Sequence, residues 1–506
     1  MDTSGKRLKF GVACSYAYSI TQVGVNLIYV PLLLRGLGAN EYGLYQLVGA
    51  MISYMNIFAV MFQGATTRYY CEFFAKGDEL GMQSVLGASR RIYHILSFVV
   101  GVIGICCIFG FGFVYREVLS AFQVTESSLM ILLLIINLIV VMNNSVNVSV
   151  INAHERFYFI KSLQLATVVL QPILVIVVIQ FWPYAIVVTI VQVILNSVCA
   201  VAQRIYARMV LGACATMKNG YEYLTKEVIK FSSVVVLALV ADQIFWKSNQ
   251  LILGYDFGMV VVAVYSVAMQ LQMVYMTVGT AISNVFMPRV SILYHNKHDM
   301  RAVSDLFIRV GRLSLFPLLL ILTGFILLGQ PFLDLWVGAA YGEAYFIAIV
   351  ILVPLTVDLV QNIGLCILQV ANKYSFRGIS YFIMSLANIA FVAWLAPRFG
   401  ALGAALCSGV LMFLVNGPVM NIYYKRKIGL DIRLFWTNVL RIIFPLMLYF
   451  FAAKMLMDFV SVDITTWGVF LAIVMAYSIG FGLVSMFFSM NSSERAMIAR
   501  VFRLVK

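Results

Sequence analysis

The sequence predicts an all-α, polytopic membrane protein of about 14 transmembrane helices: two parallel six-helix lobes around a central cavity, plus two C-terminal helices. The chain of 506 residues is 62% hydrophobic and 11% charged, with a mean hydropathy of +0.96. So few polar residues cannot cover the surfaces of soluble domains. Apolar runs of about 18 residues or more recur along the whole chain, which is the length a helix needs to cross a bilayer. Basic residues, in addition, gather in alternate loops.

The apolar runs place the spans in order. Runs such as "ILLLIINLIVVM" do not alternate polar and apolar residues, which argues against the strands of a membrane barrel. The first run follows Lys6, Arg7 and Lys9 and has no small-residue cleavage site, so we expect a retained helix. The expected spans are residues 10–34, 43–63, 92–114, 128–150, 158–181, 183–203, 229–253, 258–286, 313–330, 343–370, 378–396, 400–423, 435–457 and 465–489.

The distribution of positive charge supports this count, because an error of one span would exchange the sides of every later loop. With fourteen spans, 30 of the 35 Lys and Arg residues lie on the side that holds both termini. The opposite side holds Arg35, Arg116, Arg398 and Lys454, and Lys247 lies inside a span. The positive-inside rule assigns the basic side to the cytoplasm. The net charge of +14 then reflects topology, and no nucleic-acid partner is expected.

An internal repeat is visible in two charged stretches. "TRYYCEFFAKGD" at 67–78 is echoed by "PRVSILYHNKHD" at 288–299, an offset of 221 residues. The matched positions are Arg68 with Arg289, Lys76 with Lys297, and Asp78 with Asp299. Six is an even number of spans, so the repeat is parallel, about an axis along the membrane normal. We therefore expect an N-terminal lobe at 1–203, a cytoplasmic connector at 204–228, a C-terminal lobe at 229–423, and two further helices with a cytoplasmic tail at 424–506.

Polar residues recur at helical spacing within several expected spans, so that each forms one continuous face. Facing polar stripes in two lobes would line a deep aqueous cavity, as in a transporter. Single amides can equally tie helices together by hydrogen bonds, and this alternative stays open. The candidate cavity residues on these stripes are Gln22, Asn26, Asn144, Gln192, Asn196, Gln270, Gln361 and Asn362.

The seventh span, "ADQIFWKSNQLILG", carries both an acid and a base. Asp242, Trp246 and Asn249 share one line of the helix, and Lys247 lies on the neighbouring line. A charge at mid-bilayer costs at least about 2.5 kcal/mol, so these groups should face water, substrate or one another. Lys247 is a candidate for binding an anionic substrate, or alternatively reaches outward to the interface.

Cation coupling is the role we expect for a buried carboxylate. Asp242 of the seventh span and Asp358 of the tenth are the candidates. Asp358 lies near Pro354, where a kink would open backbone carbonyls to the cavity.

Several motifs occur in a characteristic order: "LLLRGLGANEYGLYQLV" at 32–48, "TRYYCEFFAKGD", "NAHERF" with its counterpart "VANKYSF", "NQLILGYDFG", and "RFGALGAAL". Through these motifs the chain resembles the Wzx-type polysaccharide (O-antigen) flippases of the multidrug/oligosaccharidyl-lipid/polysaccharide (MOP) exporter superfamily. The resemblance covers essentially the whole chain. That superfamily also holds the multidrug and toxin extrusion antiporters and the lipid II flippase. One departure is that Asn249 and Gln250 stand where such proteins often have an aspartate and a basic residue. An ion-coupling role is therefore not carried over to this position.

The resemblance implies a substrate and a location. The substrate would be an undecaprenyl-diphosphate-linked oligosaccharide, moved from the cytoplasmic to the outer leaflet of a bacterial inner membrane by alternating access coupled to an H⁺ or Na⁺ gradient. Membrane lipids and a polysaccharide polymerase or ligase would be partners. Lys247, together with Arg35 or Arg68, would bind the diphosphate. Arg68 and Arg289 would meet it at the cytoplasmic rim or latch a gate there, unless the two stretches only fix topology and cap helices.

Two other functions are alternatives to this one. A drug or cation antiporter of the same superfamily would share the two lobes, but such a protein usually lacks the two extra helices and favours a more acidic cavity. A membrane-embedded polymerase, ligase or acyltransferase would place acids, bases or histidines in a sizeable loop. The expected outer loops are short, so we expect a transporter and not an enzyme. The eight cysteines and four histidines lack CxxC and zinc-ligand spacing, so we expect no disulfide, metal or other cofactor.

Overall fold

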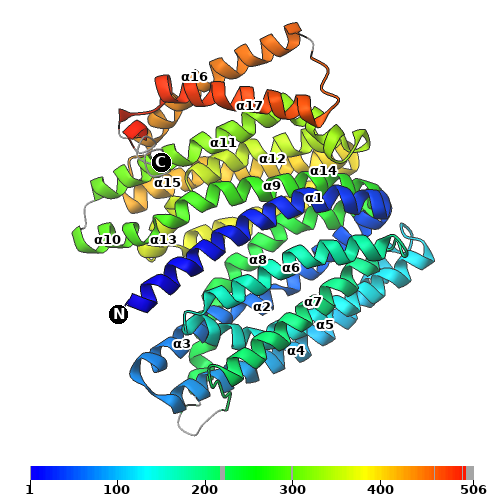
Figure 1. The fold of residues 1–506 in the computed structure, drawn as a ribbon, viewed down its shortest axis with the longest axis vertical. Coiled ribbons are helices and arrows are strands. Elements are labelled where there is room, and N and C mark those ends of the chain that lie inside the picture. The colour runs from blue at the N-terminus through cyan, green and yellow to red at the C-terminus, as the bar shows by residue number, and fades with distance from the viewer. Residues whose placement is uncertain are drawn as a thin grey trace. The chain divides into compact units, whose positions relative to one another are not determined.

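The computed structural model describes residues 2–216, 221, 223–297, 300–460, 462–492 and 494–496. Asp299, the third position of the second charged stretch, lies outside these residues. The elements in the described ranges are helices, which confirms the all-α prediction, and Figure 1 traces them in chain order.

The first half of the chain folds into helices that pack on one another. They are α1 (Asp2–Met55), α2 (Ile57–Met61), α3 (Gln63–Lys76), α4 (Glu79–Tyr115), α5 (Ala121–Ala153), α6 (Phe157–Ile179), α7 (Ala185–Met209), α8 (Tyr223–Phe257) and α9 (Met259–Val285). Helix α5 packs against α4 and α7, while α1 packs against α6 and α8.

The second half continues with shorter helices between long ones. They are α10 (Met287–Lys297), α11 (Met300–Trp336), α12 (Glu343–Val360), α13 (Ile363–Val370), α14 (Ser375–Leu414), α15 (Met420–Tyr423), α16 (Ile432–Val460) and α17 (Trp467–Val484). Helix α12 packs against α11 and α14, and the two C-terminal helices α16 and α17 pack on α11.

Packing divides the chain into two compact units, Met1–Ser266 and Val267–Lys506, here called the N-terminal and C-terminal units. The division falls inside α9. The repeat expected from the sequence instead ends its first lobe at residue 203 and begins its second at residue 229. The two divisions differ because the repeat is defined by matching residues, whereas the units are defined by contacts. The six-helix lobes themselves stay a prediction.

Eleven described segments are long and apolar enough to cross a membrane. Two of them are too long for one crossing, Ala17–Lys76 and Ser375–Ile428, and each contains a glycine with non-helical dihedrals, Gly38 (φ 79°) and Gly400 (φ 61°). Positive φ is costly for residues with a side chain, so glycine is required where the two helices join. Dividing each of these two segments at its glycine gives thirteen spans. Helix α8 corresponds to the fourteenth, the expected span 229–253; some of its side chains lie outside the described residues.

The motif "ANEYGLYQLV" forms a tightly packed part of α1. Tyr42, Leu44 and Leu47 are fully buried. A Cβ on Gly43 would lie 1.9 Å from the backbone oxygen of Met259, so only glycine allows α1 to approach the first residue of α9 this closely.

The outward faces of the long helices are apolar. On α4, Phe98 is 75% exposed and Phe113 is 70% exposed. Aromatic side chains exposed to this extent along a whole helix are typical of a surface that faces lipid.

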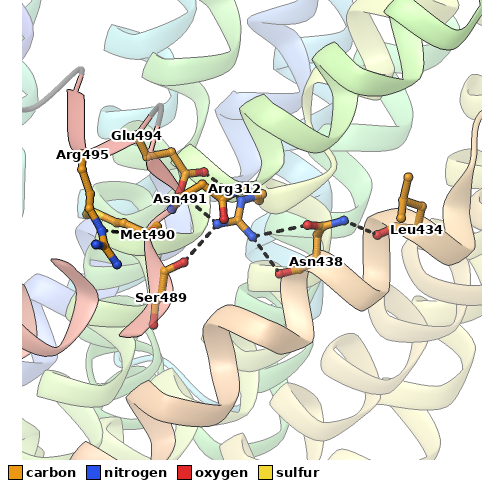
Figure 2. Close-up of polar contacts among 8 residues, drawn as sticks. All are labelled: Arg312, Leu434, Asn438, Ser489, Met490, Asn491, Glu494 and Arg495. Carbon is orange, nitrogen blue, oxygen red and sulfur yellow. Dashed lines mark hydrogen bonds and ion pairs between the residues drawn. The ribbon is translucent and has the colours of Figure 1, made fainter. Parts of the chain in front are cut away.

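A buried ion pair attaches the C-terminal segment to α11 (Figure 2). Nε and Nη2 of Arg312 donate to the two carboxylate oxygens of Glu494 at 2.8 and 2.9 Å, and Nη2 also donates to the carbonyl of Ser489 at 3.0 Å. Nη1 of Arg312 donates to the carbonyl of Asn438 on α16 at 3.3 Å. One guanidinium therefore joins α11 to α16 and to the segment that follows α17.

Candidate functional site

A cavity of about 600 Å³ lies in the N-terminal unit beside Arg68 and is here called the Arg68 cavity. Helix α3 contributes Gln63, Thr67 and Arg68, α5 contributes Asn152, and α8 contributes Ser232. Arg68 is exposed, and the hydroxyl of Ser232 is buried with no hydrogen-bond partner among the described residues. The cavity therefore combines one cationic group with several neutral hydrogen-bonding groups, as an oxygen-rich anionic ligand requires.

The charged stretch at 67–78 forms the end of α3 and the turn into α4. Gly77 closes α3 in the left-handed conformation (φ 68°), and Asp78 caps α4 by accepting from the backbone N–H of Gly81 at 2.8 Å. Tyr221, from the expected connector, donates its hydroxyl to the other carboxylate oxygen of Asp78 at 2.8 Å. These two bonds, the Gly81 one first, hold the pKa of Asp78 below its usual range. Helix capping is thus one function of this stretch, and Arg68 is the part of it that reaches the cavity.

The same end of the unit holds a histidine in an aromatic setting. His154, at the end of α5, lies 3.2 Å from the hydroxyl of Tyr70, and its ring packs on Phe74 with a centroid distance of 4.6 Å. Burial, followed by the nearby charge of Arg156, lowers the pKa of His154 below its usual value of 6.5. The motif "NAHERF" therefore packs onto α3.

Helix α8 carries the expected charged pair. Lys247 and Asp242 are both half-buried, and they lie close enough for their charges to attract each other. Trp246 is half-buried beside them and packs edge-on against Phe245. Asn249 is buried and donates to the hydroxyl of Tyr265 on α9 at 2.8 Å. The departure from the family pattern at position 249 is thus an amide that ties α8 to α9.

The asparagines of α5 bond to α7. Asn196 donates to Asn137 at 3.1 Å, and Asn144 donates to the side chain of Gln203. These are the interhelical amide bonds that the sequence left open as an alternative to a cavity lining. Gln192 is half-buried on the same helix, α7.

Helix α1 carries the remaining candidates of this unit. Gln22 and Asn26 are half-buried, and Arg35 is exposed three residues before the kink at Gly38. Their places in a binding cavity stay predictions.

In the C-terminal unit, two candidate residues meet around Asn416. An ion pair joins Asp358 to Arg377, with 3.7 Å between Oδ1 and Nη2. Arg377 is buried, lies 4.1 Å over the ring of Tyr381, and donates to the side-chain oxygen of Asn416 at 2.8 Å. Gln361 donates to the backbone oxygen of Asn416 at 3.4 Å. A carboxylate, a guanidinium and two amides thus share one buried site.

Other candidates of this unit lie on neighbouring helices. Asn362 is half-buried at the break between α12 and α13, which divides the expected tenth span into two helices. Gln270 is half-buried on α9, and Arg289 is exposed on α10.

Two members of the Asn416 site were missed by the sequence reasoning. Arg377 directly precedes the expected span 378–396, a position at which the sequence predicts a loop charge. Asn416 lies inside a π-helical turn, Val415–Val419, which follows α14. Such turns often mark functional positions, and the Asn-Gly-Pro sequence that follows a helical run is the only local signal for it.

Comparisons with known proteins agree with this architecture. A model of the family described as "Polysaccharide biosynthesis protein" (Polysacc_synt_3) matches residues 79–345. No curated protein matches the sequence.

Solved structures of the same fold include two kinds of transporter. The lipid II flippase MurJ in an inward closed conformation is similar with a TM-score of 0.73 and 13% identity, over 95% of this chain and 98% of that one. An inward-facing multidrug resistance MATE transporter of the MOP superfamily has a TM-score of 0.62 and 12% identity, over 80% and 96%. The MATE multidrug transporter DinF-BH has a TM-score of 0.56 and 15% identity, over 84% and 96%.

At these identities the structures show a shared fold, while the family model covers more than half of the chain. The resemblance stated from the motifs is thereby confirmed. The chain has the fold of the MOP transporters and belongs to the polysaccharide biosynthesis protein family.

Proposed function

We propose that this protein is a flippase for a lipid-linked oligosaccharide of the undecaprenyl-diphosphate type. It moves its substrate from the cytoplasmic to the outer leaflet of a bacterial inner membrane by alternating access. Family membership and the MOP fold support a transporter of polysaccharide precursors. The observation that carries the substrate class is Arg68 beside hydroxyl and amide groups in a cavity of about 600 Å³.

The chemistry of each part of the substrate matches a kind of side chain. A diphosphate is anionic and binds arginine and lysine well. Arg68 and Lys247 supply such charges in the N-terminal unit, and Arg289 holds the matching position in the C-terminal unit. Sugar hydroxyls need amide and hydroxyl partners, which Gln63, Asn152 and Ser232 provide in the Arg68 cavity.

Coupling to a cation is assigned to carboxylates in each unit, Asp242 and Asp358. Asp358 already holds a cationic partner, Arg377. A coupling cation would take the place of that guanidinium during the cycle, which supplies the two alternative pairings a switch requires.

Transport itself can be tested by depleting the protein. Lipid-linked oligosaccharide should then accumulate on the cytoplasmic leaflet of spheroplast membranes. In rescue experiments, R68Q/R289Q, D242N, K247Q and D358N should each abolish outward movement at normal protein levels. The control R116Q, which removes an arginine on the opposite expected side, should restore it. Wild-type transport by the R68Q/R289Q variant would leave only the capping and topological roles for the two stretches.

A drug antiporter is the second candidate, because the MATE transporters share the fold. It predicts that expression raises resistance to cationic dyes without changing lipid-linked oligosaccharide. The same depleted strain, assayed for both readouts, separates the two functions.

A further inference from the structure

A second cavity in the N-terminal unit, of about 500 Å³, lies between α4 and α7 over the face of α5. It is here called the Arg90 cavity. Its polar lining consists of Arg90 and His94 from α4, Asn143, Asn144 and Asn147 from α5, and Ser197 and Arg204 from α7. None of these residues lines the Arg68 cavity.

Among the residues that the structure describes, no acidic side chain in the lining balances the positive charge of this cavity. Arg90 is half-buried, and within the described part of the chain it makes no hydrogen bond or ion pair. Instead, the guanidinium groups of Arg204 and Arg208 lie near enough to repel it. No described acidic side chain lines the cavity. Cations brought together in a partly desolvated place cost free energy unless an anion joins them.

The amide of Asn143, which also lines the Arg90 cavity, is a second indication of a ligand. Asn143 donates to Ser97 at 2.9 Å and to the carbonyl of Ile139 at 2.9 Å, but its own side-chain oxygen is buried without a described partner. A ligand that brings a hydroxyl beside its anionic group would satisfy this oxygen. The arginines and the amide together fit a phosphate with a neighbouring alcohol, as in a phosphoglycerol group.

The surroundings of the cavity indicate that such a phosphate belongs to a lipid. On α4, the exposed side chains that follow Arg90 and His94 are Ile95 and Phe98, and on α7 those before Arg204 are Val198 and Val201. Acyl chains can lie along these apolar faces while the headgroup enters the cavity. Basic pockets between transmembrane helices bind lipid phosphates in this manner.

We propose that the Arg90 cavity is a binding site for the phosphate headgroup of an anionic membrane lipid, separate from the transport path. The lipid neutralises Arg90 and Arg204 and joins the ends of α4 and α7. This binding needs no transported substrate.

The test is lipid retention by the purified full-length protein, measured by native mass spectrometry with phosphatidylglycerol or phosphatidylcholine in the detergent. Wild type should retain phosphatidylglycerol in preference to phosphatidylcholine. R90Q/R204Q should bind phosphatidylglycerol roughly 10- to 30-fold more weakly, from about 1 kcal/mol for each lost charge. The control R91Q/R116Q removes the same net charge from exposed positions outside the cavity and should bind as wild type does.

Three results would overturn the proposal. One is an equal loss in R91Q/R116Q, which would indicate non-specific attraction. Another is displacement of the lipid by equimolar glycerol 3-phosphate, which would indicate a site for a free phosphate. The last is undiminished retention by R90Q/R204Q. Should that double variant unfold, the exposed single variant R204Q gives the same comparison. Retention by R68Q should be unchanged, so the lipid site and the proposed transport function can fail separately.

Discussion

Arg312 and Glu494, separated by 182 residues of sequence, form a buried ion pair in which two nitrogens of the guanidinium meet the two oxygens of the carboxylate. The two side chains are 4% and 5% exposed, respectively. A buried pair of this geometry adds little stability compared with apolar residues, but loss of one partner leaves an uncompensated charge. The C-terminal segment therefore depends on this contact for its position on α11.

The variant E494A should lower the free energy of unfolding by about 3–5 kcal/mol, because Arg312 keeps its charge in a buried place without a carboxylate. Denaturant titration in detergent micelles measures this change. The double variant R312M/E494L should recover much of the loss, since both charges are removed. The exposed pair Lys76 and Glu72 serves as a control, and E72Q should leave the unfolding midpoint unchanged. Equal midpoints for E494A and E72Q would contradict the assigned role.

The variant G43A should destabilise the N-terminal unit. Its Cβ would lie 1.9 Å from the backbone oxygen of Met259, and a backbone atom cannot move aside as a flexible side chain can. The expected cost is at least about 1–3 kcal/mol. The matched control is G49A on the same helix, where no atom lies within 4 Å of the added Cβ. That substitution should stabilise the helix by about 0.5–1 kcal/mol. A melting temperature for G43A that is no lower than that of G49A would refute the close approach of α1 to α9.

The sequence predicted the helical architecture well, because hydropathy reports directly which segments cross a membrane. The join at Gly38 falls in the gap expected between the first two spans, and the join at Gly400 falls on the first residue of the expected span 400–423. Hydropathy does not identify, however, which charged residues are buried inside the protein. Arg377 and Arg312 lie at the edges of expected spans and looked like topology signals, yet both are buried with acidic partners. Their partners are set by tertiary packing, which a single sequence does not reveal.

The candidate site was predictable in its residue types but not in its contacts. The amides of α5 and α7 were expected to face a cavity or each other, and the structure shows that Asn144 and Asn196 bond between helices. Asn144 also lines the Arg90 cavity, and not the Arg68 cavity. Helical periodicity gives the face of a helix, whereas the neighbour of that face depends on how the helices assemble.

Stability should fall in mild acid through His154. Burial beside Tyr70 and Phe74, and then the charge of Arg156, lower its pKa in the folded protein. The folded state therefore binds fewer protons than the unfolded state, and the stabilisation present above about pH 6.5 is lost as pH falls through the lowered folded value. Unfolding midpoints measured between pH 8 and pH 5 should decline less steeply for H154Q than for wild type. As a control, H94Q changes an exposed histidine, and its unfolding midpoint should fall with pH as steeply as that of wild type. If the midpoint of H154Q also fell as steeply as that of wild type, groups other than His154 would govern the decline.

Arg377 and a coupling cation should compete for Asp358. The guanidinium is 3.7 Å from the carboxylate and is held by Asn416 and the ring of Tyr381, so it occupies the place a cation would need. Na⁺ serves as the probe. Its protection against thermal unfolding should saturate at a roughly tenfold lower Na⁺ concentration in R377Q than in wild type, because the Arg377 guanidinium no longer competes for the carboxylate and a coupling of this kind typically changes affinity by such a factor. In D358N the Na⁺ response should disappear, because the carboxylate is gone. The control D334N changes an exposed carboxylate on α11 and should titrate as wild type does. If R377Q and wild type showed the same Na⁺ dependence while D358N lost the Na⁺ response, Arg377 would have no part in cation coupling. If D358N kept the Na⁺ response, Asp358 would have no part in it either.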